Sequence, residues 1–135
     1  MTELAHSRPL VLILEDEALI ALDLQDELQD AGCAVAGPLT SCSAALEWLG
    51  TATPTMAILD TALNDGPCSN VAAELSRREV PFLIYSGHQE KHHVLADLPH
   101  LAWIEKPAPP AVVVRACQQS LVASPKFLGE ALNLR

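Results

Sequence analysis

Polar side chains with chemical potential follow four apolar runs of this 135-residue sequence. They are Glu15 and Asp16 after LVLIL, Asp60 after TMAIL, Ser86 after VPFLIY, and Lys106 soon after LAWI. Crowded carboxylates repel one another unless a cation lies among them, and hard oxygen ligands suit Mg²⁺. These residue types therefore predict a magnesium site, provided that the fold brings the carboxylates together. Glu17 is expected to stay outside it, because a carboxylate in the first turn of a helix is stabilised by the helix dipole.

The four apolar runs are expected to be strands of one parallel sheet, since continuous apolar runs are typical of strands buried on both faces. A further short strand is predicted at 33–36, ended by Gly37-Pro38. Helical patterns lie between the strands, at 17–31, 41–50, 71–79 and 111–123, with a weak one near 90–97. This alternation predicts an α/β fold with helices on both faces of the sheet. Ligands of such sheets bind beyond the carboxyl ends of the strands, which is where the polar side chains lie.

Composition limits the classes of function. Half of the residues are apolar and 19% are charged, which is typical of a single globular domain. The formal net charge of −9 argues against direct binding of nucleic acid, which needs a basic patch. No apolar run approaches the roughly 20 residues of a membrane span, and the N-terminus lacks a hydrophobic signal region. We therefore expect a cytoplasmic protein that binds neither nucleic acid nor membrane.

Cysteine and histidine spacing predicts no further metal site. The four cysteines, Cys33, Cys42, Cys68 and Cys117, show no C-x-x-C or C-x-x-H spacing. We interpret them as small core residues in a reducing compartment. The histidines at 88, 92 and 93 lie in a polar stretch without an evident fourth ligand, so we interpret them as solvated surface residues.

Four stretches in order, LILEDE, AILD, LIYSG and WIEKP, closely resemble the motifs of the response-regulator receiver domain, the phospho-acceptor half of two-component signalling. The resemblance covers residues 9–122, which leaves a flexible N-terminus at 1–8 and a tail or short helix at 123–135. It implies a doubly wound, five-stranded parallel sheet of the flavodoxin-like, CheY-like kind, with strand order 2-1-3-4-5.

The resemblance also implies a role for each matching residue. Asp60 would be the nucleophile that is phosphorylated by a kinase histidine. Mg²⁺ would be held by Glu15, Asp16, Asp60 and the backbone carbonyl of Ala62. Lys106 would pair with a phosphoryl oxygen, or with Asp60 when the site is empty.

Two further positions would belong to the switch that reads phosphorylation. Ser86 would donate a hydrogen bond to the phosphoryl group, and Trp103 occupies the aromatic switch position, although a static core role for this ring stays open. Lys106-Pro107 matches a peptide bond that is usually cis in the family. The side chains of Ala62 and His88 would flank the path of the water that hydrolyses the aspartyl phosphate.

The sequence departs from the usual receiver pattern in two places. The loop after Asp60 lacks the common proline four residues on, and the segment between Ser86 and Trp103 has a poor helical pattern. We therefore expect a short or irregular fourth helix. PFLIYSGH resembles, loosely, a receiver subgroup with an F-A-T-G-Y-like signature, whose members tend to pair with kinases of the HWE/HisKA_2 type.

The function implied is that of a single-domain response regulator in a phosphorelay, a monomer or weak homodimer that works with a histidine kinase or a phosphotransfer protein. It would not be an enzyme, beyond catalysing its own phosphorylation and dephosphorylation. One alternative is a haloacid-dehalogenase-like phosphatase, which needs an acid two residues after the nucleophile, where this chain has Ala62. Another is a degenerate receiver that acts only as a binding scaffold. Nucleotide binding is disfavoured, because neither glycine-rich phosphate motif is present.

Overall fold

A five-stranded parallel sheet forms the centre of the computed structural model, which describes residues 8–87, 100 and 102–123. The strand order is β2-β1-β3-β4-β5, so the predicted order 2-1-3-4-5 is confirmed. The strands are β1 (Leu10–Leu14), β2 (Ala34–Leu39), β3 (Met56–Leu59), β4 (Phe82–Ser86) and β5 (Trp103–Glu105). The order reverses beside β1, which places the carboxyl ends of β1 and β3 next to each other at the switch point.

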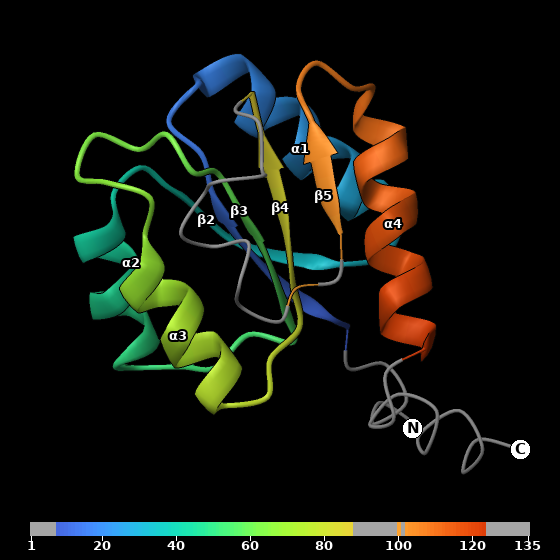
Figure 1. Cartoon of the computed structure of the whole chain (residues 1–135). Coiled ribbons are helices and arrows are strands. Elements are labelled where there is room, and N and C mark those ends of the chain that lie inside the picture. Colours follow the sequence, from blue (N-terminus) through green and yellow to red (C-terminus); the bar gives the residue numbers. More distant parts are fainter. Residues whose placement is uncertain (1–7, 88–99, 101, 124–135) are drawn as a thin grey trace, which may run out of the picture.

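Helices cover both faces of the sheet, as the alternating pattern predicts (Figure 1). Among the described residues they are α1 (Ala18–Asp30), α2 (Cys42–Leu49), α3 (Ser69–Arg77) and α4 (Pro110–Ala123). Helices α2 and α3 lie together on one face, and α1 and α4 lie on the other. The described part of the chain holds no helix long and apolar enough to cross a membrane.

The alternation of side chains along each strand divides the core into two layers. In β1, Leu12 and Leu14 pack with the buried residues of α2 and α3. Val11 and Ile13 point the other way and pack with those of α1 and α4. Because both layers are completely apolar at the strand centres, the continuous apolar runs in the sequence are explained.

The edge strand β2 is longer than predicted, because it continues through Gly37-Pro38 to Leu39 instead of ending there. Its register against β1 shifts between Leu12 and Leu14, so β2 holds one more residue than β1 over this stretch. Gly37 has φ +98°, and a Cβ atom there would lie 2.8 Å from the carbonyl oxygen of Ile13. Only glycine fits this close approach of β2 to β1.

Helix ends lie within a few residues of the predicted ranges, at residues that favour helix ends. Ser41 caps α2, its hydroxyl accepting a hydrogen bond from the N–H of Ala44, and Gly50 follows its last turn. Gly32 follows α1 with a positive φ of 92°. Pro110 begins α4, in keeping with the preference of proline for the first turn. The expected short fourth helix and the histidines at 88, 92 and 93 lie outside the described residues, as do most of the two predicted terminal segments.

The interpretation of all four cysteines as free core residues is wrong for two of them. Cys42 and Cys68 form a disulfide bond, whereas Cys33 and Cys117 are free and buried. A separation of 26 residues carries no local signal in the sequence. The pairing arises because the fold places the N-terminus of α3 beside that of α2.

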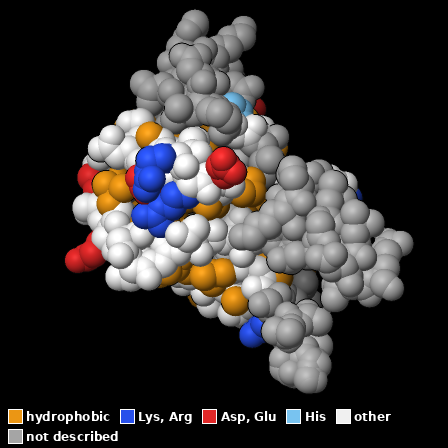
Figure 2. Space-filling model, turned by 90° about the horizontal axis from the view of Figure 1, so that it is seen from below, with side chains coloured by type: hydrophobic (Ala, Val, Ile, Leu, Met, Phe, Trp, Pro, Cys, Tyr) orange, Lys and Arg blue, Asp and Glu red, His pale blue; other side chains and the backbone are white. Residues whose placement is uncertain are grey.

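Seen from the opposite end of the sheet, the molecule shows a small group of basic side chains with acidic ones beside it (Figure 2). Arg77 and Arg78, at the end of α3, both form ion pairs with Glu74. The two guanidinium groups lower the pKa of the Glu74 carboxyl to about 2, chiefly through hydrogen bonds. Both guanidinium groups therefore have local partners within or beside α3.

Candidate functional site

Backbone hydrogen bonds at the carboxyl edge of the sheet fix the two strand ends that carry the predicted metal ligands. The N–H of Asp60 donates to the carbonyl of Leu14, at 3.1 Å, which ties the end of β3 to the end of β1. The N–H of Glu15 donates to the carbonyl of Leu39, at 3.0 Å. The extension of β2 past Gly37-Pro38 therefore supports Glu15 directly.

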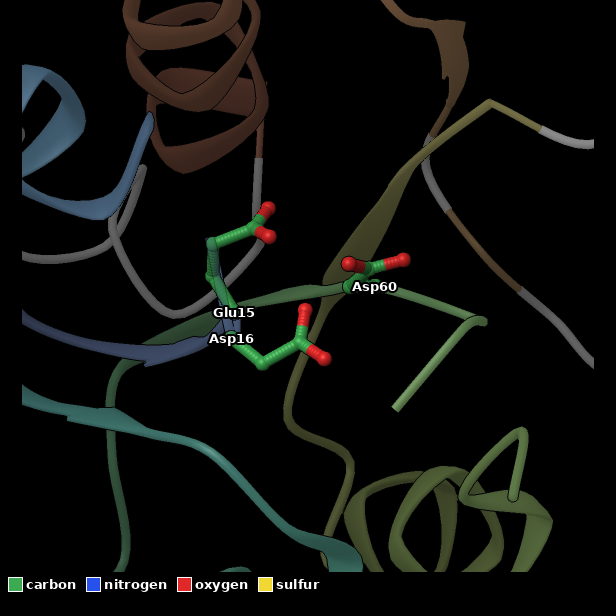
Figure 3. Close-up of side chains that lie close together, drawn as sticks. All are labelled: Glu15, Asp16 and Asp60. Atoms are coloured by element: carbon green, nitrogen blue, oxygen red, sulfur yellow. The ribbon is translucent and has the colours of Figure 1, made fainter. Parts of the chain in front are cut away.

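Glu15, Asp16 and Asp60 converge at this edge, each offering a carboxylate oxygen within 4.8 Å of the others (Figure 3). Glu15 and Asp60 are both only 2% exposed, whereas Asp16 is partly exposed to solvent. Three carboxylates that leave one side open to water match the preference of Mg²⁺ for oxygen ligands and retained waters. The donor set thus fits the metal that the sequence predicts.

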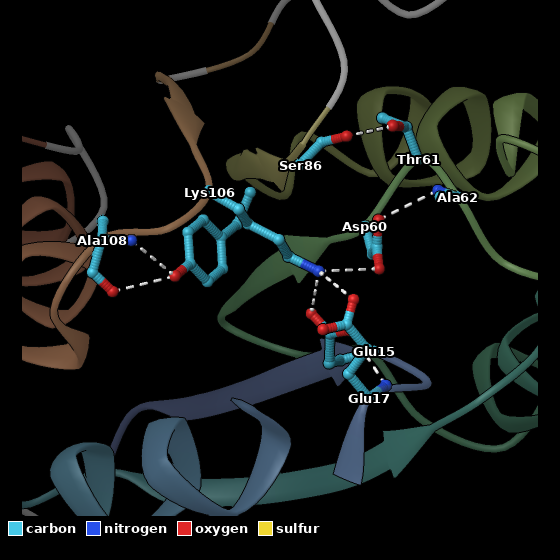
Figure 4. Close-up of polar contacts among 9 residues, drawn as sticks. Glu15, Glu17, Asp60, Thr61, Ala62, Ser86, Lys106 and Ala108 are labelled. Carbon is cyan, nitrogen blue, oxygen red and sulfur yellow. Dashed lines mark hydrogen bonds and ion pairs between the residues drawn. The ribbon is translucent and has the colours of Figure 1, made fainter. Parts of the chain in front are cut away.

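Lys106 lies among the buried carboxylates (Figure 4). Its ammonium nitrogen, Nζ, is 2.9 Å from a Glu15 oxygen and 3.1 Å from Oδ2 of Asp60. The backbone N–H of Lys106 donates to the carbonyl of Ser86, which fixes the end of β5 against β4. Its side chain is 11% exposed, so these ion pairs are largely shielded from water.

Burial sets the electrostatics of this group. It raises the pKa of the Glu15 carboxyl to about 7, although hydrogen bonds from Lys106 and from the N–H of Glu17 act in the opposite direction. Burial alone would lower the pKa of the Lys106 ammonium, but its hydrogen bonds to Glu15 and Asp60 hold that pKa above its ordinary value. The cluster therefore keeps one fixed cation and one carboxylate that titrates near neutral pH.

Glu17 lies closer to the site than predicted. It is the N-cap residue of α1, is largely exposed, and its carboxylate lies 3.6 Å from Nζ of Lys106. The cluster of three carboxylates does not include it. An exposed ion pair of this length contributes little to stability.

Two buried hydroxyl groups meet beside Asp60. The hydroxyl of Ser86, at the end of β4, is hydrogen bonded to that of Thr61, which directly follows Asp60. The N–H of Ala62 donates to Oδ1 of Asp60, at 2.9 Å. Thr61 lies in the loop after Asp60 and is not among the predicted site residues. Its position next to a strand-end carboxylate is the signal that could have found it.

Tyr85 is a second residue outside the predicted site, since the sequence predicts it only as part of a buried strand. Its hydroxyl donates to the carbonyl of Ala108 and accepts from the N–H of the same residue, at 2.9 and 3.1 Å. Nζ of Lys106 lies 5.5 Å from the centre of the Tyr85 ring, within range of a cation–π interaction. Tyr85 thus contacts the β5–α4 loop on both sides of the Lys106-Pro107 peptide bond. This bond is cis, as the family resemblance implies.

Trp103 begins β5 and pairs with Ile84 of β4. Its ring is half-buried, packs against the core layer that includes α2 and α3, and contacts the ring of His100 edge to face, with the ring centres 5.8 Å apart. Strand β4 lies between β5 and the strand that ends at Asp60. The predicted switch role of Trp103 requires a second conformation and stays a prediction.

A cleft of about 700 Å³ opens over the carboxylates. Asp16, Asp60, Ala62, Tyr85 and Lys106 all contribute to its lining. The cleft gives an incoming group direct access to the Asp60 carboxylate and to the ammonium of Lys106.

Solved structures of similar fold were found, whereas no protein-family model and no curated protein matches the sequence significantly. A response regulator receiver protein from Sinorhizobium medicae is 28% identical, with a TM-score of 0.74 and coverage of 87% of this chain and 97% of the other. The receiver domain of PhyR, a response regulator of Erythrobacter litoralis, is 27% identical, with a TM-score of 0.75 and coverage of 90% and 95%. The chemotaxis response regulator CheY4 of Vibrio cholerae has the same fold at 20% identity, with a TM-score of 0.74 and coverage of 84% and 98%.

The sheet order, the placement of carboxylates and lysine at the switch point, and these neighbours all match one class of protein, the response-regulator receiver domain. The resemblance predicted from the four motifs is confirmed, and the chain has the CheY-like receiver fold. The narrower resemblance to the F-A-T-G-Y-like subgroup stays a prediction.

Proposed function

We propose that the chain is a response regulator in which Asp60 accepts a phosphoryl group from the histidine of a kinase or a phosphotransfer protein. The observation that carries this proposal is the position of Lys106, whose Nζ bridges the buried carboxylates of Glu15 and Asp60 beneath an open cleft. Side chains from three different strand ends meet there, which a purely structural acidic turn does not require.

The two oxygens of Asp60 are held by different groups, and this orients the carboxylate for attack. The N–H of Ala62 donates to Oδ1 and Lys106 donates to Oδ2. As the phosphoryl group arrives, Lys106 would exchange its contact with Asp60 for a phosphoryl oxygen, and Ser86 would donate to another. The positive charge of the Lys106 ammonium would thus lie beside the phosphoryl oxygens, where negative charge develops during the transfer.

Glu15, Asp16, Asp60 and the backbone carbonyl of Ala62 are the groups that would hold Mg²⁺. When bound, the ion neutralises charge on the transferred group. Glu15 must be deprotonated to act as a ligand, and its raised pKa makes binding of the cation compete with binding of a proton near neutral pH.

The test is incubation with acetyl phosphate and Mg²⁺, followed by intact mass and an acid-lability check. We expect one phosphoryl group, which Asp60→Asn abolishes, while Asp23→Asn, an exposed carboxylate on α1, serves as the matched control. Labelling of Asp60→Asn would overturn the assignment. Continuous release of phosphate from added phosphate monoesters would instead support the phosphatase alternative, which the alanine at position 62 disfavours. Labelling rates with purified histidine kinases would then identify the donor.

A further inference from the structure

The Cys42–Cys68 pair lies at the far end of the loop that begins with Asp60. Cys42 is the first residue of α2, and Cys68 is the N-cap residue of α3. Their Cα atoms are 5.1 Å apart, and the residues are 9% and 4% exposed. The bond therefore joins the end of the 61–68 loop to a helix on the same face of the sheet.

The 61–68 loop also carries groups of the site at its beginning. The hydroxyl of Thr61 is hydrogen bonded to that of Ser86, and the N–H of Ala62 donates a hydrogen bond to Asp60. In its middle, the carboxylate of Asp65 accepts from the N–H groups of Cys42 and Ser43, at 2.8 and 3.1 Å. The disulfide is the covalent member of this set of contacts, so its formation or loss changes how firmly the loop is held against α2.

The surroundings of the pair suit both oxidation states. Sγ of Cys42 lies 3.4 Å from the carbonyl oxygen of Gly66, a contact that a thiol can make as a hydrogen-bond donor and a disulfide cannot. Cys68 lies at the N-terminus of α3, and the N–H dipoles at such a terminus favour a thiolate, the nucleophile of disulfide exchange.

The two other cysteines, Cys33 and Cys117, lie in surroundings that disfavour a reactive thiolate. Burial raises the pKa of the Cys33 thiol, and it raises the pKa of the Cys117 thiol to about 12. Both are free and buried, which makes them internal controls for thiol reactivity.

We propose that Cys42 and Cys68 are a reversible thiol–disulfide modification site whose oxidation state controls the order of the 61–68 loop. Through Thr61 and Ala62, it would thereby adjust how readily Asp60 is phosphorylated, an effect that rests on the proposed function. The oxidant is a low-molecular-weight disulfide, such as glutathione disulfide.

The reaction is two successive thiol–disulfide exchanges. The Cys68 thiolate attacks one sulfur of glutathione disulfide, whose S–S bond breaks and releases a glutathione thiolate. The Cys42 thiolate then attacks the Cys68 sulfur of the mixed disulfide and releases the second glutathione thiolate. The protein loses two electrons and two thiol protons, and the glutathione disulfide gains both. Since both sulfurs are buried, exchange requires transient opening of the loop.

The site is tested on the full chain, equilibrated in glutathione buffers of increasing oxidised fraction. After acid quenching, free thiols are alkylated under denaturing conditions and mapped by mass spectrometry. We expect one disulfide, between Cys42 and Cys68, that forms and disappears reversibly, while Cys33 and Cys117 stay alkylatable throughout. Four free thiols at every ratio, or glutathione adducts that never resolve to this disulfide, would overturn the proposal.

The coupling to the loop is tested by amide hydrogen exchange, which needs neither Mg²⁺ nor a phosphodonor. Peptides covering 61–68 should exchange at least about threefold faster in the reduced protein, with peptides from α1 and α4 unchanged. Equal exchange in the two states would overturn the control of loop order.

The effect on phosphorylation is measured last, as the labelling rate with acetyl phosphate at limiting Mg²⁺. We expect the oxidised protein to be labelled at least about threefold faster, because its loop is already ordered. Cys42→Ala and Cys68→Ala, checked for folding by their melting temperatures, should label at one rate in both buffers. If oxidised and reduced wild-type protein are labelled at the same rate, the proposed effect of the disulfide on phosphorylation of Asp60 is wrong. No labelling in either state would overturn the proposed function and with it this step, whereas the disulfide and the exchange data would still decide the modification site.

Discussion

The hydroxyl groups of Thr61 and Ser86 are hydrogen bonded to each other across the gap between the ends of β3 and β4. Both residues are buried, and Ser86 is 0% exposed. If Ser86 is to donate to a phosphoryl group on Asp60, this bond must break or turn. Thr61 therefore competes with the phosphoryl group for the Ser86 hydroxyl.

Replacing Thr61 by Val removes this competitor and keeps the shape of the side chain. A buried hydrogen bond contributes about 1 kcal/mol, so we expect Thr61→Val to raise the phosphorylated fraction at a fixed acetyl phosphate concentration by up to about fivefold. Ser86→Ala should lower that fraction. The double variant should match Ser86→Ala alone, and an added effect of Thr61→Val in that background would contradict the competition.

Lys106→Met tests the cation that bridges Glu15 and Asp60. Removing one partner of a buried ion pair leaves carboxylates that face one another without compensation, at a cost of about 3 kcal/mol. Urea unfolding in EDTA should show this loss, and saturating Mg²⁺ should recover more stability in the variant than in wild type. Equal responses of both proteins to Mg²⁺ would show that Lys106 and the cation do not share this site.

The raised pKa of Glu15 predicts how stability depends on pH in the absence of metal. The folded state binds this proton more tightly than the unfolded state, so the stabilisation is complete below pH 4.5 and is lost as the pH rises through about 7. The shift corresponds to a loss of at most about 3 kcal/mol over this window. Urea unfolding in EDTA at several pH values should show it, and Glu15→Gln should remove that part of the pH dependence, whereas Asp23→Asn should keep it.

Tyr85→Phe tests the two hydrogen bonds that hold Ala108. Without the hydroxyl, the β5–α4 loop loses these two hydrogen bonds to β4, and Lys106 is positioned less firmly. We expect a loss of stability of about 1 kcal/mol and a labelling rate lower by about threefold. If the hydroxyl serves packing alone, stability falls while the rate at saturating Mg²⁺ and acetyl phosphate stays that of wild type.

The sequence predicts the centre of this fold well because the strands there are buried on both faces. The side chains of LVLIL and TMAIL alternate between two apolar core layers. The polar residues that follow these parallel strands therefore lie at the same edge of the sheet. Glu15, Asp16, Asp60 and Lys106 are brought together as predicted, since their positions follow from strand order alone.

The errors lie where neighbours distant in sequence decide the structure. The sequence predicts that Gly37-Pro38 ends a strand. The structure continues β2 through these residues, because an edge strand needs hydrogen bonds on one side only. Thr61, Tyr85 and the Cys42–Cys68 bond each depend on a partner from another element. No local pattern encodes those partners.

The extra residue of β2 has a consequence for how copies of this molecule meet. An open sheet edge is a template on which further strands, from other copies, can add in solution. Pro38 cannot donate a backbone hydrogen bond to such a strand, and the irregular register of Gly37-Pro38 breaks the straight ladder that stacking requires. The same irregular stretch that leads β2 to the contact of Leu39 with Glu15 thus also makes the outer side of β2 a poor template for edge-to-edge aggregation.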